Sequence, residues 1–443
     1  MFGQLVPLIA CGSSMFASTY ALANVFPYLG FMVADLTGSS QNEIGYQAGY
    51  IAGSFMGARI ISSFVWGILA DKIGRKPVLV IGCASLCLFQ LLFGASSSIS
   101  WAIVWRMFMG FFSAGIIGTA KTAASELVKE EDLSWAMNVI TGFANIGLVL
   151  GPALSGLTYN MRVRWLEDFF YIYPYFIPNV IASAFAFVAM ILILVGLPES
   201  LPERDIADQL CIPESIYSKC GRLWSCQDVR CATFLYCFHS FISIYAIEVY
   251  PLWMMSSVTV GGFGMSVTSI GITMCIAAVV LVIYQLVFYS FIVKGMSAIN
   301  LAIISSVLTA VYFEQLPWVS ELVNHNKDVL LYLVIQRSIL NMINVTLFTN
   351  INVMVNNSCL NADRGTVNGM TISLGSIAKS MGPIFGSNIF AWSINSDNSM
   401  PFNYQISFHI LALCGGLLAL YLGKRTPLSL NNPMQLKYEM VPI

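Results

Sequence analysis

Long runs of apolar residues alternate along the chain with short polar segments. A helix that crosses a bilayer needs about 20 predominantly apolar residues, because each residue advances the helix by about 1.5 Å. About twelve such runs can be placed, so the pattern predicts an all-α membrane protein with twelve transmembrane helices. The predicted spans are residues 5–33, 46–69, 78–96, 101–124, 135–157, 171–197, 233–256, 267–293, 298–316, 329–353, 367–392 and 405–423.

The longest polar interruption, residues 198–232, separates the first six predicted spans from the last six. It therefore reads as a cytoplasmic linker between an N-terminal six-helix bundle, residues 1–197, and a C-terminal six-helix bundle, residues 233–423. A cytoplasmic tail, residues 424–443, follows the last span.

The two halves also resemble each other in sequence. A shift of 231 residues superimposes Arg106 on Arg337 and Gly151-Pro152 on Gly382-Pro383. Such internal repeats are typical of secondary transporters, which are built from duplicated bundles. We therefore predict two pseudo-symmetric bundles.

Composition excludes other classes of protein. The chain is 57% hydrophobic and 10% charged, whereas soluble domains carry about 25% charged residues. With both termini cytoplasmic, the opposite loops hold few basic residues, Arg162, Arg164 and Lys327, as the positive-inside rule requires. The net charge of −1 and the lack of a basic face argue against a nucleic-acid partner.

The eleven cysteines predict neither a disulfide framework nor a metal site. On this topology none falls in an extracytoplasmic loop, and the four in the linker lack the Cys-x-x-Cys spacing of zinc sites. We expect no metal and no cofactor. No nucleophile, base and orienting group gather in one loop, so we expect no enzyme activity.

A charged, glycine-marked turn links the second and third predicted spans. Its residues suit a conformational latch on the cytoplasmic side: Gly67 permits close helix approach, Gly74 permits an unusual backbone turn, and Asp71 can pair with Arg75 or Lys76. The alternative is a simple basic anchor, which needs neither the glycines nor the acid.

The fifth span carries a stripe of small residues with one proline, which can form a hinge or a close packing seam against a neighbouring helix. The stripe consists of Gly142, Gly147, Gly151, Pro152 and Gly156.

Charges inside the hydrocarbon are costly and call for a function. The one deep acid, Glu248, and Arg106 both fall in the outer half of their spans, which predicts a proton-coupling pair. Its alternative is a structural ion pair. We expect Lys121 to reach the inner surface and His239 to be an ordinary packing residue.

Polar residues on the seventh and tenth spans predict a central substrate cavity, since lipid would penalise such a face. The predicted cavity residues are Arg59, Arg337, Lys379, Asn341, Asn344 and Tyr245. Belt positions at the membrane interface are the alternative for Tyr245.

With the turn, Arg106 and the fifth-span stripe in view, the chain resembles twelve-span proton antiporters of the major facilitator superfamily. Within it, the chain is most similar to the zinc-induced facilitator-like group. Supporting stretches include Ser54-Phe55-Met56-Gly57-Ala58-Arg59, Leu197-Pro198-Glu199-Ser200 and Lys379-Ser380-Met381-Gly382-Pro383. Many exporters of the superfamily hold an acid in the first span, and residues 1–33 contain none, which moves the expected proton carrier to Glu248.

The resemblance implies a proton-coupled antiporter that exports or sequesters a small organic solute by alternating access. The alternatives are a facilitative carrier without proton coupling and a non-transporting nutrient sensor. The expected partners are the solute, protons and membrane lipid, and we expect a monomer. The expected location is the plasma membrane or a vacuolar or endolysosomal membrane.

Overall fold

The computed structural model of the chain describes residues 2–38, 41–128, 133–159, 168, 172–200, 216–323, 329–360, 363–395, 400 and 402–432. In these ranges the regular structure is helical and no strand occurs. The predicted all-α fold is therefore confirmed. The centre of the predicted linker, residues 201–215, and the end of the tail, residues 433–443, lie outside the described residues.

The N-terminal half is built from helices that follow the first six predicted spans. These are α1 (Phe2–Ala23), α2 (Phe26–Thr37), α3 (Gln41–Ile73), α4 (Arg75–Gly94), α5 (Ile99–Ser113), α6 (Gly115–Leu127), α7 (Leu133–Thr158) and α9 (Phe176–Gly196).

The C-terminal half follows the last six spans, preceded by a short linker helix, α10 (Ile216–Ser225). Its elements are α11 (Gln227–Met255), the 3-10 turn η3 (Val258–Val260), α12 (Val267–Ile283), the π-turn η4 (Tyr284–Phe288), α13 (Tyr289–Lys294), α14 (Ala298–Val323), α15 (Val329–Asn357), α16 (Arg364–Asn395), α17 (Ile406–Arg425) and the 3-10 turn η6 (Leu428–Asn431).

Three predicted spans are interrupted rather than continuous. The first breaks between α1 and α2, just before Pro27, whose missing N–H and ring disfavour a continuous helix. The fourth divides at Ala114, between α5 and α6, and the eighth contains the π-turn η4. Sequence reasoning placed these spans but not their breaks.

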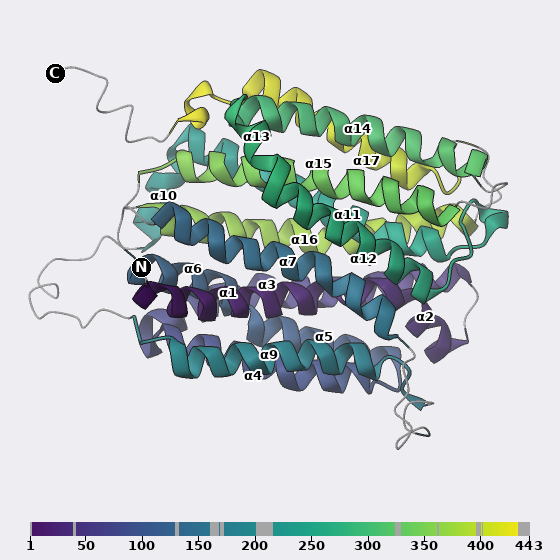
Figure 1. Cartoon of the computed structure of the whole chain (residues 1–443), viewed down its shortest axis with the longest axis horizontal. Coiled ribbons are helices and arrows are strands. Elements are labelled where there is room, and N and C mark those ends of the chain that lie inside the picture. The colour runs from purple at the N-terminus through teal and green to yellow at the C-terminus, as the bar shows by residue number, and fades with distance from the viewer. Residues whose placement is uncertain are drawn as a thin grey trace, which may run out of the picture.

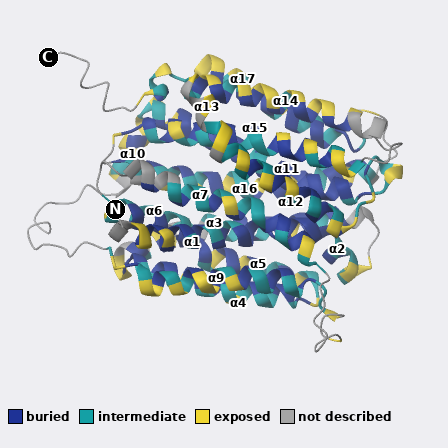
Figure 2. Cartoon of the chain, viewed as in Figure 1, coloured by how far each residue is buried: buried dark blue, intermediate teal, exposed yellow. Residues whose placement is uncertain are grey.

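Figure 1 shows the helices running side by side along the long axis, with α4 and α9 at one edge and α14 and α17 at the other. The middle is occupied by α3, α7, α11 and α16. Helix α10 lies at the same end as the start of α1, and we call this the linker end. Burial rises from the edges towards the middle helices (Figure 2).

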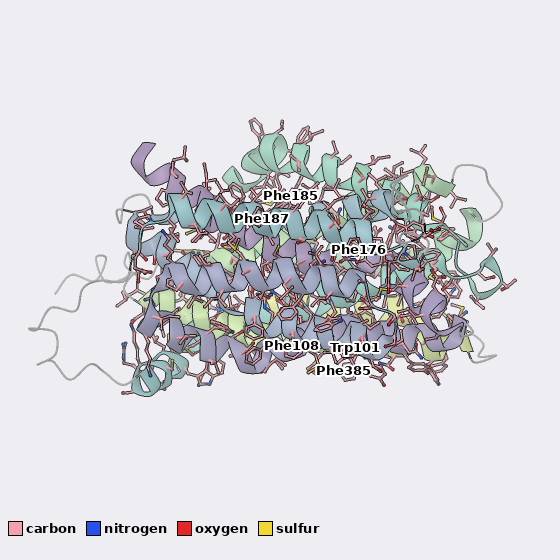
Figure 3. The ribbon with its side chains drawn as sticks, turned by 90° about the horizontal axis from the view of Figure 1, so that it is seen from below. Trp101, Phe108, Phe176, Phe185, Phe187 and Phe385 are labelled. Carbon is pink, nitrogen blue, oxygen red and sulfur yellow. The ribbon has the colours of Figure 1, made fainter. Side chains whose placement is uncertain are left out.

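Large apolar side chains remain exposed on the outer faces, as expected for a surface that meets lipid. Trp101, Phe108 and Phe385 lie along one side of the molecule (Figure 3) and are each about half exposed. Among the described residues, nine helices are apolar and long enough to cross a membrane. Helix α12 is shorter than these, and α3 and α16 do not meet the same apolar criterion.

Helices α3 and α16 carry a lower apolar content because they pack against each other across the two halves. A Cβ on Gly45 would contact Ala391, and one on Gly53 would contact Ile384. A second cross-half contact joins α7 to α12, where a Cβ on Gly156 would overlap the backbone of Gly271. Small residues let membrane helices approach this closely. Both contacts lie away from the linker end and hold the two halves together there.

We predict that Gly156→Ala opens this contact. The added methyl group meets backbone, which cannot rotate away, so the closed arrangement should lose about 1–3 kcal/mol, the usual cost of overpacking. Hydrogen–deuterium exchange should rise at the end of α7 and the start of α12. The matched control is Gly416→Ala in α17, where a Cβ would meet nothing within 4 Å. Equal exchange in the two variants would contradict the prediction.

Candidate substrate cavity

Two adjoining cavities lie between the halves. The larger, about 120 Å³, is lined by residues of α1, α3, α6, α7, α11, α15 and α16, and we call it the linker-side cavity. The smaller, about 60 Å³, is lined from α7, α11, α12, α14 and α15, and we call it the central cavity. Both are lined by Asn145, His239, Ser243 and Asn344, so they lie side by side.

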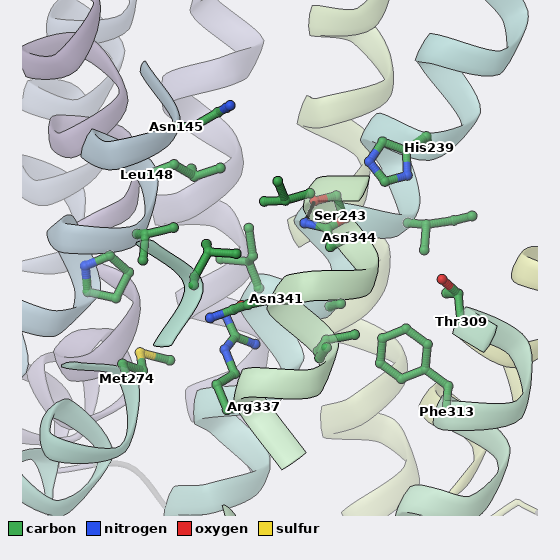
Figure 4. A pocket seen from close by; sticks show the side chains of 18 residues that line it. Asn145, Leu148, His239, Ser243, Met274, Thr309, Phe313, Arg337, Asn341 and Asn344 are labelled. Atoms are coloured by element: carbon green, nitrogen blue, oxygen red, sulfur yellow. Dashed lines mark hydrogen bonds between the residues drawn. The ribbon is translucent and has the colours of Figure 1, made fainter. Parts of the chain in front are cut away.

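The central cavity contains the predicted residues Arg337 and Asn341 of α15, with Asn344 one turn further along (Figure 4). The Arg337 guanidinium lies 4.9 Å from the centre of the Tyr250 ring, a cation–π contact. The Asn344 amide donates a hydrogen bond of 3.1 Å to Ser243 of α11. The predicted amides Asn341 and Asn344 therefore line the cavity, and their contact with a solute stays a prediction.

The linker-side cavity contains the other two predicted cations. Arg59 is buried and donates hydrogen bonds to the Ser18 hydroxyl at 3.2 Å and to the Ser113 carbonyl at 3.1 Å. Lys379 approaches the Tyr236 hydroxyl, with Nζ 3.4 Å from the oxygen. The partners in these contacts are neutral, and neither side chain is paired with a carboxylate among the described residues.

Two further cavity residues were not predicted as such. Lys121, expected at the inner surface, lines the linker-side cavity and lies within electrostatic range of Lys379. His239, expected to be a packing residue, lines both cavities, and neither ring nitrogen has a hydrogen-bond partner among the described residues. The sequence did not predict that these two side chains enter the cavity. Their directions depend on the break between α5 and α6 and on the way α11 crosses its neighbours.

No Asp or Glu occurs among the described residues that line the two cavities. The lining instead combines four cationic side chains, several amides and hydroxyls, and many apolar groups. An uncompensated positive field in a partly desolvated space attracts anions more strongly than the same charges in water. The chemistry of the site thus favours a solute that carries negative charge.

Arg106 lies outside both linings and is fully buried. Its guanidinium donates to the carbonyls of Ala21 at 2.9 Å and Leu22 at 3.3 Å, where α1 ends, and faces the Phe55 and Phe93 rings. It therefore satisfies carbonyls at the break in the first span.

Glu248 is also buried and lines neither cavity. Its two carboxylate oxygens have no hydrogen-bond partner among the described residues. It lies within electrostatic range of Arg106, but the two groups do not form a contact ion pair in the described structure. The predicted pair is brought to one region of the interface, and its role in proton coupling stays a prediction.

Tyr245 lies elsewhere than the sequence interpretation placed it. It is fully buried among α11, α16 and Phe241, beside Gly382 and Gly386, and does not line either cavity. On α11, adjacent residues lie on different faces, one meeting α16 and the other meeting the cavity. The sequence alone did not fix which of these faces Tyr245 would occupy.

The glycine stripe of α7 has two partners. Gly147 and Gly151 pack against α1, while Gly156 packs against α12 of the other half. Pro152 lines the central cavity, and a Cβ on Gly142 would meet nothing within 4 Å. Gly156 and Pro152 therefore lie where one half meets the other, whereas Gly147 and Gly151 pack within the N-terminal half, and the action of the stripe as a hinge stays a prediction.

The predicted latch has partners that the sequence interpretation did not name. Gly74 has a φ of 104°, a conformation that favours glycine. The Arg75 side chain pairs with Glu126 at the end of α6, at 3.1 Å. The Glu199 carboxylate accepts hydrogen bonds from the backbone N–H groups of Arg75 at 2.8 Å and Lys76 at 3.1 Å. An acid at a helix N-terminus is stabilised by the helix dipole.

One of the reasons given for the latch needs correction, and another is not tested. A Cβ on Gly67 would meet nothing within 4 Å, so no close helix approach depends on it. The Asp71 side chain lies outside the described residues. Sequence reasoning missed Glu126 and the capping role of Glu199, although the Leu-Pro-Glu-Ser stretch was noted. Both acids are distant in sequence from the turn, and only folding brings them to it.

Two six-helix halves around a polar cavity, with close contacts at one end, define an integral multi-pass secondary transporter. The family model of the Major Facilitator Superfamily matches residues 11–383. The chain belongs to this superfamily.

Similar proteins agree with this assignment. A probable peptide/nitrate transporter of Arabidopsis thaliana is 31% identical over 395 residues, which cover 84% of this chain and 80% of the relative. The protein zinc induced facilitator-like 1 of the same plant is 29% identical, covering 84% and 81%. A D-xylose–proton symporter structure matches with a TM-score of 0.73 at 14% identity, covering 97% of this chain and 99% of that chain, which shows a shared fold.

The latch geometry yields a double-mutant prediction. Glu199→Ala should lower stability by about 1 kcal/mol, because it removes a helix cap. Gly74→Ala should cost about 1–3 kcal/mol, because it forces a strained φ and its Cβ would overlap the Glu199 carboxylate. The double variant should lose less than the sum, since the overlap disappears with Glu199.

Thermal unfolding midpoints in detergent measure these effects. Lys72→Ala, an exposed change in the last turn of α3, is the control and should leave the midpoint unchanged. Strict additivity of the two substitutions would contradict the proposed contact between Gly74 and Glu199.

Proposed function

We propose that this protein is a proton-coupled antiporter that exports or sequesters a small organic solute by alternating access. The observation that carries the proposal is the pair of adjoining polar cavities between two halves, which also pack closely through α3–α16 and α7–α12 contacts away from the linker end. A polar space at a bundle interface is where secondary transporters bind their solutes. Export across a plasma membrane and loading of a vacuolar or endolysosomal compartment both fit this mechanism.

Alternating access requires contacts that can form and break. The α3–α16 and α7–α12 seams consist of small side chains, which part with little loss of buried side-chain area. At the linker end, the Arg75–Glu126 pair and the Glu199 cap hold α4, α6 and the end of α9 together within one half. Each half can thus tilt as a unit while the seams open and close.

The proposed proton carrier is Glu248. It is the acid buried at the interface of the halves, and its oxygens lack protein hydrogen bonds among the described residues. The free energy of ionising such a group depends strongly on water access and on nearby positive charge. Tilting of the halves changes both, through solvent and through the distance to Arg106, so this carboxyl group can exchange a proton with one side at a time.

A facilitative carrier without proton coupling is the second candidate. The observation that favours it is the position of Glu248 and Arg106 outside both cavities, with Arg106 engaged by the α1 carbonyls. In that case Glu248 and Arg106 have a structural role and take no part in proton transfer.

Glu248→Gln distinguishes the two candidates. The amide keeps the shape of the side chain but cannot carry a proton, so solute accumulation driven by an imposed pH gradient should fall at least tenfold. Exchange of labelled for unlabelled solute without a gradient should persist. Reconstituted vesicles loaded with a panel of organic solutes provide both measurements.

The control is Glu314→Gln in α14. Its carboxylate is 3.0 Å from His409 and is more than half exposed, outside both cavities. This variant should retain gradient-driven uptake. Undiminished accumulation by the Glu248→Gln protein would show that proton coupling does not pass through this residue, whereas a facilitative carrier would show no accumulation under the pH gradient even in the unaltered protein.

A further inference from the structure

We infer that the solute is an organic anion with an apolar body, and that its anionic group binds between Lys121 of α6 and Lys379 of α16. The inference rests on the proposed transport function and adds the chemical class of the solute. It also assigns the anion a part in the conformational change, because the two lysines belong to different halves.

The two ammonium groups are the least satisfied charges in the linker-side cavity. Arg59 already donates to Ser18 and Ser113. Lys379 has one long contact with the Tyr236 hydroxyl, and no hydrogen bond from Lys121 to a described residue occurs. His239 adds two unpartnered ring nitrogens to the same lining. The lining offers these cationic donors no carboxylate acceptor among the described residues, and a ligand with anionic oxygens would supply one.

The repulsion between Lys121 and Lys379 acts across the two halves. Lys121 is on the N-terminal half and Lys379 on the C-terminal half, and both line the linker-side cavity. In the empty cavity this repulsion opposes closure at the linker end. An anion between the two ammonium groups replaces one repulsion with two attractions, so closure over the solute becomes favourable.

The remainder of the lining favours an organic anion over a small inorganic one. Beside the cations lie the Tyr236 and Phe348 rings, 5.9 Å apart, with Met56, Leu148 and Ile372. A bare inorganic anion would leave these apolar groups in contact with water. An aromatic or aliphatic body attached to the anionic group would bury them, as in most small-molecule sites.

Binding of two isosteric probes tests the charge requirement. The probes are 2-naphthalenesulfonate and the neutral 2-naphthalenesulfonamide, measured by equilibrium dialysis of the full-length protein in detergent against empty micelles. The sulfonate should bind at least tenfold more tightly than the sulfonamide. Lys121→Gln and Lys379→Gln should each weaken sulfonate binding about tenfold and leave sulfonamide binding unchanged, since each removes one charged hydrogen-bond donor.

The matched control is Lys424→Gln at the end of α17, an exposed lysine outside both cavities, which should bind the sulfonate like the unaltered protein. Unfolding midpoints of all three variants verify that they fold. Equal affinity for the two probes, or competition by nitrate or phosphate as strong as that by the sulfonate, would overturn the inference.

Hydrogen–deuterium exchange tests the bridge between the halves. The sulfonate should slow exchange at the linker ends of both α6 and α16, and either lysine substitution should abolish protection of both helices. Protection of one helix alone would overturn the bridging arrangement. These measurements use no pH gradient, so they succeed or fail independently of Glu248, whereas loss of transport with intact anion binding would count against the proposed function only.

Discussion

Positive charge buried without a facing carboxylate is the constraint on which this molecule depends. In a bilayer, a cation must be satisfied by the protein or by a ligand, since lipid cannot solvate it. Arg106 is satisfied by the α1 carbonyls and two aromatic rings, and Arg59 by hydroxyl and carbonyl oxygens. Of the lysines in the linker-side cavity, Lys379 has one long contact with the Tyr236 hydroxyl and Lys121 has no hydrogen bond to a described residue, and this difference separates structural cations from those available to a solute.

Close packing of small residues is the complementary feature. The same glycines that allow α7 to contact α1 and α12 leave no large side chains to interlock. Dispersion contacts between backbones then hold the halves, and these are short-ranged and quickly lost on tilting. Tight packing favours contact between the two halves at one end of the interface, whereas charge repulsion favours their separation at the other end. This opposition is a physical basis for two alternating arrangements.

The latch shows how a short motif acquires its partners from distant sequence. The turn at Gly74 is encoded locally, because glycine tolerates its positive φ. The acids that engage it, Glu126 and Glu199, come from the ends of α6 and α9. Pairing inside the turn was the nearest interpretation from sequence, and the fold adds contacts that connect three helices of one half.

The sequence by itself determined the helical membrane fold, the spans, the duplication and the polar character of α15, because hydrophobic length and composition are local properties that the bilayer reads directly. Tertiary structure decided which residues share the cavity. It placed Lys121 and His239 inside, and Tyr245, Arg106 and Glu248 outside, because helix breaks and rotational phase are set by packing between helices. Rotating a helix about its axis by about a third of a turn moves a side chain from the cavity to the packed core. The sequence of one helix alone does not encode that rotation.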